Sequence, residues 1–295
     1  MNQAVLPSPS SAGPGPAFAG EAELGRAEFD AIAEIMHSDA RIKLTAAKTT
    51  LVHSRLSRRL REHGLATFRD YVRLVQQDPA ERAAMVVALT TNHTHFFREA
   101  HHFDHLRDKV LPALKSKAPG SGVRIWSAGC SSGEEVYTIA MCLLGTDRAS
   151  AAWTRGSDVR LLATDLSPPV VEAAAKGLYA PSAAEGVPLP YRRQWMRETP
   201  SGFQMAEEAR DLVTARVLNL FGPWPMRRQF DVIFCRNVMI YFDDDAKAEL
   251  EMRLVDQLAP GGHLYIGHSE RLIGAGQRGM ESCGQTIYVK TGGRG

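Results

Sequence analysis

The sequence predicts an α/β domain that follows an all-α N-terminal domain. From residue 123 onward, short apolar runs rich in β-branched residues, such as "VRIWSAG" and "VRLLATDLS", alternate with helical stretches. Strands that alternate with helices are typical of βαβ units and a mostly parallel sheet. Residues 21–90 carry only helical patterns, such as the stripe of Phe29, Ile32 and Ile35 in "AEFDAIAEIM".

Changes in composition place the remaining boundaries. Residues 1–20 are rich in Pro, Gly, Ser and Ala, which predicts a disordered tail. Residues 91–122 are expected to form a linker and a connecting helix before the α/β domain of residues 123–295. Residues 177–216 interrupt the strand–helix alternation with Pro and Gly, so we interpret them as an insertion, a small β-subdomain with a few antiparallel strands.

Composition excludes several classes of protein. The longest apolar runs, such as "DVIFCRNVMIYF", are too short and too polar for a transmembrane helix, and the N-terminus lacks the pattern of a secretory signal. The four cysteines are far apart and form no CxxC pair, which is typical of free thiols in a reducing cytoplasm. The formal charge of +2 is too small to indicate a partner.

The first predicted strand leads into a glycine turn and a helix in "IWSAGCSSGEEVYTIAM". Ligands of open parallel sheets bind beyond the carboxyl ends of the strands, and Gly129 and Gly133 allow close approach there. The turn is not G-x-G-x-x-G, and Glu134 and Glu135 would repel a pyrophosphate. These acids favour a cationic ligand, such as a sulfonium or an amino group, unless they only complement the helix dipole.

Later strand ends carry further polar residues. Asp165 ends "LLATD", where a carboxylate can accept both hydroxyls of a ribose or cap the next helix. Asn219 and Leu220 suit the edge and face of an adenine. Arg236 follows the buried run "DVIFC" and must leave the core or find a partner. Together these features indicate an adenosyl ligand with a positively charged amino-acid tail, namely S-adenosylmethionine.

Four long motifs, "ALTTNHTHFFREAHHF", "IWSAGCSSGEEVYTIA", "FDVIFCRNVMIYFD" and "GGHLYIGHSE", closely resemble the CheR family of chemotaxis receptor methyltransferases. The resemblance covers roughly residues 25–290. It implies a Rossmann-like S-adenosylmethionine-dependent methyltransferase domain with a small β-subdomain, preceded by an all-α domain. It also implies transfer of a methyl group to glutamate side chains of chemoreceptors in the cytoplasm, which yields γ-carboxyl methyl esters and S-adenosylhomocysteine.

The resemblance also implies roles for individual residues. The cofactor contacts would be Asn92, Thr94, Arg98, Glu135, Asp165, Asn219, Leu220, Arg236 and Asn237. Arg98 and Tyr241 would face the transferable methyl group and the incoming glutamate, although Tyr241 could instead be an aromatic residue packed at a strand end. Because a carboxylate is already ionised near neutral pH, the reaction needs no general base.

The five histidines of "TTNHTHFFREAHHFDH" raise the question of a metal site. His101 and His105 lie four residues apart, which places two imidazoles on one face of a helix. We expect no metal there, because no cysteine or acidic cluster completes a ligand set. In the family this segment closes over the cofactor, with Thr, Asn and Arg as the contacting residues.

A basic helix face is the candidate partner surface. Arg55, Arg58, Arg59 and Arg61 lie beside the apolar stripe of a helix; such a face is either solvated or meets an acidic partner or nucleic acid. The resemblance implies the methylation helices of chemoreceptors. Nucleic acid is not expected because no aromatics interleave, nor is membrane insertion. A stretch shorter than the family pattern, "MRETPSGFQMAEEAR", argues against docking of a receptor C-terminal peptide.

Two other functions remain open. One is a methyltransferase that acts on nucleic acid or a small molecule, although "CRNVMIYF" lacks the Asn/Asp-Pro-Pro-aromatic motif of enzymes that methylate base amino groups. The other is a cofactor-binding signalling module without turnover. Such a module would be expected to have lost residues such as Arg98 or Tyr241, and both are present.

Overall fold

The computed structural model describes residues 22–292. The chain divides into two compact units. Among the described residues, the smaller unit holds residues 22–32 and 45–89, and the larger unit holds the rest. The tail predicted for residues 1–20 lies outside the described residues.

The smaller unit is helical. Its elements are α1 (Arg26–Ala40, whose second half belongs to the larger unit), η1 (Ala46–Lys48), α2 (Thr49–Glu62), α3 (Phe68–Gln77) and α4 (Pro79–Leu89). Helix α3 begins after Thr67, because the Thr67 hydroxyl accepts a hydrogen bond from the Asp70 N–H at 3.2 Å. It ends before Asp78, whose extended backbone suits the residue before a proline.

A buried carboxylate, Glu81, ties three of these helical segments together. Its side chain is only 3% exposed and pairs with Arg59 of α2. It also accepts hydrogen bonds from the Tyr71 hydroxyl of α3 and from Nε2 of His63, each at 2.7 Å. Burial favours the neutral acid, but the hydrogen bonds from Arg59, Tyr71 and His63 prevail and hold the pKa of Glu81 below its usual value.

The larger unit is built on a seven-stranded sheet with the strand order β6-β2-β1-β7-β8-β10-β9. The strands are β1 (Val123–Ala128), β2 (Val159–Asp165), β6 (Val213–Val217), β7 (Phe230–Cys235), β8 (Leu258–Ile266), β9 (Met280–Gly284) and β10 (Ile287–Lys290). All pairs from β6 to β8 are parallel, which confirms the predicted sheet, and β10 is antiparallel to both neighbours. The chain leaves β1 toward β2 and later returns to β7, so the strand order reverses between β1 and β7.

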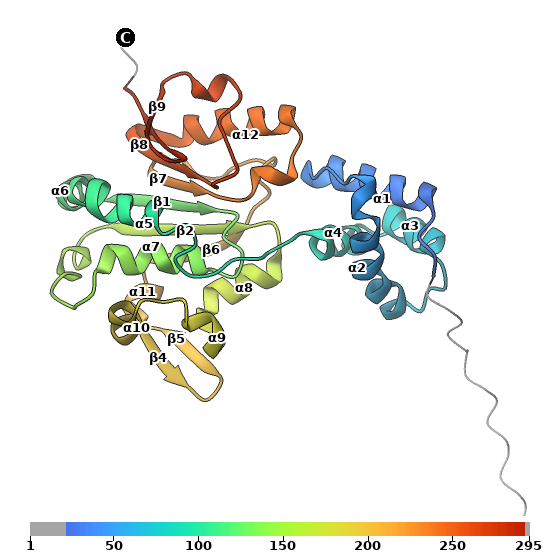
Figure 1. Ribbon diagram of the computed structural model, residues 1–295, viewed down its shortest axis with the longest axis horizontal. Coiled ribbons are helices and arrows are strands. Elements are labelled where there is room, and N and C mark those ends of the chain that lie inside the picture. The colour runs from blue at the N-terminus through green and yellow to red at the C-terminus, as the bar shows by residue number, and fades with distance from the viewer. Residues whose placement is uncertain (1–21, 293–295) are drawn as a thin grey trace, which may run out of the picture. The chain divides into compact units, whose positions relative to one another are not determined.

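Helices complete the larger unit. They are α5 (His101–His105), the π-helical turn η2 (Leu106–Val110), α6 (Leu111–Ser121), α7 (Glu134–Leu144), η3 (Ala152–Thr154), α8 (Pro168–Lys176), η4 (Met239–Tyr241), α12 (Asp244–Gln257) and η5 (Ala275–Gln277). Helices lie on both faces of the sheet (Figure 1), and each face is covered by its own hydrophobic core. Val232 and Phe234 of β7 join the core that contains α6 and α7, whereas Ile233 and Cys235 join the core that contains α12.

The segment interpreted as an insertion contains a second, three-stranded antiparallel sheet with the order β3-β5-β4. Its elements are β3 (Leu178–Tyr179), α9 (Pro181–Ala184), α10 (Leu189–Trp195), β4 (Met196–Thr199), β5 (Gly202–Met205) and α11 (Glu207–Arg210). The antiparallel strands expected from the sequence are thus present. Only Pro200 and Ser201 connect β4 to β5. The main sheet resumes at Val213, where β6 pairs with β2.

Strand β9 was not anticipated, because its sequence "MESCG" shows no apolar alternation. It pairs with β10 at the edge of the sheet, where residues 281–284 are exposed. Among the described residues, no helix is long and apolar enough to cross a membrane.

We predict that Glu81→Gln lowers the free energy of unfolding by roughly 1.5–3 kcal/mol at pH 7, because a buried, charge-assisted network is broken. Circular dichroism in urea measures this. Since the folded pKa of Glu81 is lowered, its stabilisation is fully present above the ordinary glutamate pKa and is lost as the pH falls through the lowered value. Glu62→Gln is the matched control: Glu62 also pairs with Arg59 but lies at the surface, so its loss should lower the stability less than the loss of Glu81 does. Equal losses for both variants would contradict this prediction.

Candidate functional site

The glycine turn after β1 is hydrogen-bonded to the end of β2. The N–H groups of Gly129 and Cys130 both donate to the Thr164 carbonyl, at 2.8 and 2.9 Å. Gly129 has φ +81°, and a Cβ there would lie 2.4 Å from the Val238 side chain, so glycine is required at this position. The turn and the tips of β1, β2 and β7 therefore form one compact edge, at the point where the strand order reverses.

Asp165 lies at the centre of this edge and is largely buried. Its two carboxylate oxygens accept hydrogen bonds from the N–H groups of Ser131 and Ser167, at 2.9 and 3.0 Å. Burial raises the pKa of Asp165, and these backbone hydrogen bonds oppose the rise. Ser167, not Asp165, is the N-cap of α8, so the capping alternative does not hold. Each carboxylate oxygen retains a lone pair that can accept a ligand hydroxyl.

Helix α7 begins at the same edge with two acids. Gly133 is its N-cap with φ +98°, and a Cβ there would lie 2.8 Å from the Tyr179 hydroxyl. The Glu134 carboxylate accepts a hydrogen bond from Ser132 at 2.7 Å. The Glu135 carboxylate accepts one from the Ser127 hydroxyl of β1, also at 2.7 Å. The start of α7 thus places fixed negative charge beside the turn.

Arg236, the first residue after β7, is paired inside the protein. Its side chain is 2% exposed; Nη1 donates to Glu135 at 2.9 Å and Nη2 lies 3.3 Å from the Glu99 carboxylate. It also donates to the carbonyl of Arg98 and stacks over Phe103, with 5.3 Å between the guanidinium carbon and the ring centroid. Burial raises the pKa of Glu135, and Arg236 opposes this.

Glu99 connects this ion pair to the opposite side of the edge. Its Oε1 accepts hydrogen bonds from Asn237 Nδ2 at 3.3 Å and from His268 Nδ1 at 3.0 Å. Burial disfavours its ionisation, but the charge of Arg236 and these hydrogen bonds lower the pKa of Glu99 to about 2. Glu99 was not predicted as a site residue, although it directly follows Arg98 in "ALTTNHTHFFREAHHF".

A second missed acid, Glu270, fixes the backbone after β7. It is buried and accepts hydrogen bonds from the N–H groups of Asn237 and Ile240, at 3.1 and 3.3 Å. Asn237 has a left-handed backbone with φ +57°, and a Cβ on Gly267 would lie 2.5 Å from its side-chain nitrogen. Glu270 belongs to the quoted motif "GGHLYIGHSE", which is the signal that could have identified it.

The segment of residues 90–99 lies against the glycine turn. The carbonyl of Asn92 accepts a hydrogen bond from the Ser131 hydroxyl at 2.7 Å, and the Phe97 N–H donates to Thr138 of α7 at 3.2 Å. Phe97 and Glu99 have positive φ values of +55° and +59°, which flank Arg98 with strained backbone.

Side chains on this segment are accessible. Arg98 is half-buried, and its Nη1 donates to the carbonyl of His93 at 3.1 Å. Thr94 and Asn92 are also half-buried. The segment that carries Asn92, Thr94 and Arg98 is thus anchored beside the edge that holds Asp165 and Glu135, through the carbonyls of Asn92 and Arg98.

Three further predicted site residues, Asn219, Leu220 and Tyr241, make different contacts. Asn219 donates from Nδ2 to the Asp39 carbonyl at 2.8 Å and accepts from the Phe221 N–H at 2.9 Å, so its side chain has one donor and one lone pair left. The Leu220 side chain is buried in the core that contains α12. Tyr241 is half-buried on η4, where its carbonyl accepts from the Lys43 N–H at 2.9 Å.

The contacts of His102 and His105 indicate structural roles for these two histidines. His102 is fully buried and lies 2.9 Å from the Thr286 hydroxyl; burial, together with the charge of Arg236, lowers its pKa to about 3. His105 Nδ1 lies 2.9 Å from the Tyr265 hydroxyl. Among residues 22–292, no three His, Cys, Asp or Glu side chains are grouped so that they could hold a metal ion.

The arginines of the candidate partner surface lie in the smaller unit and differ from one another. Arg55 donates to the Leu89 carbonyl at 2.9 Å, and Arg59 is held by Glu81. The Arg58 side chain is 79% exposed and pairs with Glu62 at 2.8 Å, while Arg61 is exposed. Arg58 and Arg61 thus present their charge outward, whereas Arg59 also serves the fold.

The edge fits S-adenosylmethionine by its donors and acceptors. Glu134, Glu135 and Asp165 make it suitable for a cationic ligand with ribose hydroxyls. Nε of Arg236 is buried without a hydrogen-bond partner among the described residues, and a ligand carboxylate would supply one.

Comparison with known proteins agrees with this chemistry. Residues 27–90 match the family model "CheR methyltransferase, all-alpha domain", and residues 92–289 match "CheR methyltransferase, SAM binding domain". A probable chemotaxis protein methyltransferase of Rhizobium etli is 44% identical over 264 residues, which cover 87% of this chain and 97% of that protein.

Two further relatives span similar lengths. Chemotaxis protein methyltransferase 2 of Pseudomonas aeruginosa is 38% identical over 93% of this chain and 97% of its own. The chemotaxis protein methyltransferase of Escherichia coli is 37% identical over 90% of this chain and 91% of its own. The chain therefore belongs to the CheR family of S-adenosylmethionine-dependent methyltransferases.

Proposed function

We propose that this enzyme transfers the methyl group of S-adenosylmethionine to glutamate side chains on the cytoplasmic methylation helices of chemoreceptors. The products are γ-carboxyl methyl esters and S-adenosylhomocysteine. One observation carries the proposal: in a CheR-family chain, the edge that gathers Asp165 and Glu135 also receives the segment that presents Arg98. Sensory adaptation in the cytoplasm is the corresponding role.

Several residues of this edge would hold the cofactor. Asp165 would accept the ribose hydroxyls, and Glu135 together with Arg236 would contact the amino-acid part. Asn219 and Leu220 would border the adenine, while Asn92, Thr94 and Asn237 would complete the enclosure. The remaining lone pairs of Asp165 and the unpartnered Nε of Arg236 support these assignments.

The chemistry needs alignment more than proton transfer. When bound, S-adenosylmethionine supplies a methyl group on a positively charged sulfur that departs as a neutral thioether. A glutamate of ordinary pKa, about 4.3, is already ionised and can attack in line without a general base. Alignment in a site that excludes water can lower the barrier by about 7–11 kcal/mol.

Arg98 is the residue best placed to align the incoming carboxylate. The residue is half-buried, and its backbone is fixed between two residues with positive φ values. A tight ion pair would stabilise the bound glutamate in its ground state and slow the attack, so Arg98 would position rather than neutralise it. The Tyr241 hydroxyl would share this task.

The receptor helices would meet the basic face of α2. Arg58 and Arg61 point their charge outward, and methylation helices that present glutamates have the complementary sign. Arg55 and Arg59 would contribute to the field while they hold α4. We expect neither nucleic acid nor membrane insertion as part of this activity. The two-residue connection between β4 and β5 supports an enzyme that works without a receptor-tail tether.

We predict that Asp165→Ala weakens binding of S-adenosylhomocysteine by about 1.5–3 kcal/mol, because hydrogen bonds to a charged group are lost. Isothermal titration calorimetry measures this. Asp165→Asn keeps one acceptor oxygen but replaces the other with an NH2 group, which cannot accept from Ser131 or Ser167, so this variant should also bind more weakly. Asp211→Ala, at an exposed aspartate, is the control and should bind normally. Unchanged affinity in Asp165→Ala would refute the ribose assignment.

The function is tested by incubating the enzyme with methyl-labelled S-adenosylmethionine and membranes that contain the chemoreceptors of the same cell. Label on the receptor that leaves as methanol in mild base is the expected result, since carboxyl methyl esters hydrolyse this way. Arg98→Ala should reduce the labelling rate by roughly 10²-fold while the cofactor still binds. Cofactor binding without receptor labelling by the unmodified enzyme would overturn the proposal.

A further inference from the structure

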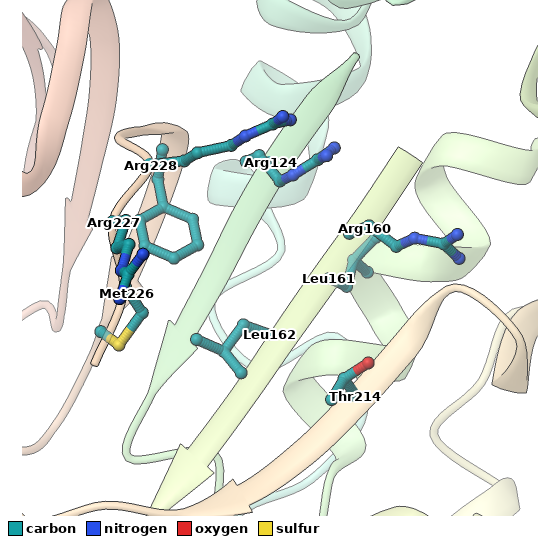
Figure 2. A pocket seen from close by; sticks show the side chains of 9 residues that line it. Arg124, Arg160, Leu161, Leu162, Thr214, Met226, Arg227 and Arg228 are labelled. Carbon is teal, nitrogen blue, oxygen red and sulfur yellow. The ribbon is translucent and has the colours of Figure 1, made fainter. Parts of the chain in front are cut away.

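A surface pocket of about 290 Å³ lies on the larger unit, away from the edge described above (Figure 2). It is lined at its base by the beginnings of two strands, since Arg124 is the second residue of β1 and Arg160 the second residue of β2. The proposed cofactor residues follow the carboxyl ends of the same strands. The two sites therefore lie at opposite ends of the same strands.

Four arginines line this pocket, and none of the nine described residues that line it is acidic. Arg124 and Arg228 extend their guanidinium groups toward the same side (Figure 2). Asp158, just outside the pocket, pairs with Arg124 and lies 3.3 Å from Arg160 and 3.8 Å from Arg228. A single carboxylate thus lies near three guanidinium groups, so the four arginines of the pocket keep a strong net positive charge.

The arginines differ in how firmly they are held. Arg124 is fixed in place, because its Nη1 donates to the carbonyls of Val123 and Asp158 at 3.0 and 2.7 Å. Arg227 is exposed, and no carboxylate of residues 22–292 lies within 4.0 Å of its guanidinium. The pocket therefore combines a prepositioned guanidinium with one that has no ion-pair partner in the described chain.

The rest of the lining is apolar. Leu162 and Met226 are half-buried, and Phe230 is buried behind them. This patch is open because the chain between β6 and β7, residues 218–229, forms neither helix nor strand over the sheet. A ligand here would meet guanidinium groups at one side and an apolar wall at the other.

We infer that this pocket binds a small phosphorylated molecule with a flat apolar part, of the size of a nucleoside monophosphate. Guanidinium groups pair with phosphate oxygens in bidentate fashion, and several of them around one pocket favour a dianion over a single carboxylate. The volume of about 290 Å³ lies at the lower end of small-molecule sites, which suits a mononucleotide better than a dinucleotide. The apolar wall suits a heterocycle. A bare anion would leave this wall uncovered.

Calorimetry tests this inference on the full-length enzyme with S-adenosylhomocysteine in excess, so that the cofactor site cannot take the probe. The probes are the four nucleoside 5′-monophosphates, their nucleosides and inorganic phosphate. At least one monophosphate should bind with a Kd below 1 mM, and the double variant Arg227→Gln/Arg228→Gln should weaken it at least tenfold. Arg216→Gln is the matched control, because Arg216 is an exposed arginine of β6 outside the pocket.

Each outcome decides the inference. Binding that the double variant weakens and Arg216→Gln leaves intact supports it. It is overturned if no monophosphate binds, if the double variant binds normally, or if inorganic phosphate or a nucleoside binds as tightly as the monophosphate. Because both replaced arginines are exposed, the double variant should keep the fold, which its unchanged affinity for S-adenosylhomocysteine would verify.

Discussion

The candidate active site depends on the ion pairs of the buried Arg236 guanidinium. This guanidinium joins three segments that are distant in sequence: the end of β7, the start of α7 through Glu135, and the strained turn through Glu99. A buried charge is tolerated only when it is paired, and removal of one partner leaves the others uncompensated. The ion pairs thereby fix the position of the turn that presents Arg98.

The sheet topology explains why these segments meet. The strand order reverses between β1 and β7, and open α/β sheets bind ligands beyond the carboxyl ends of the strands at such a point; Asp165 of the neighbouring β2 lies beside it. Around this point the acids outnumber the bases. The low pKa of Glu99 keeps it charged, while burial keeps His102 neutral. A binding site for a positively charged ligand follows from this balance.

Much of this arrangement could be predicted from the sequence, because it depends on local patterns of residues. The alternation of apolar runs predicted the parallel sheet, and polar residues at strand ends predicted the candidate site. What sequence reasoning missed depends on long-range contacts. Glu99 pairs with residues near 236, and Arg59 is held by Glu81 of another helix, which no local pattern reveals. Strand β9 was missed because edge pairing, not apolar periodicity, defines it.

A double-mutant cycle tests most directly whether Arg236 organises the site. Affinity for S-adenosylhomocysteine would be measured by calorimetry for the unmodified enzyme, Arg236→Met, Glu99→Gln and the double variant. We expect Glu99→Gln alone to weaken binding, although Glu99 is assigned no ligand contact, and the two changes to be coupled by about 0.5–3 kcal/mol. Additive effects, or normal affinity in Glu99→Gln, would show that the ion pairs do not shape the cofactor site.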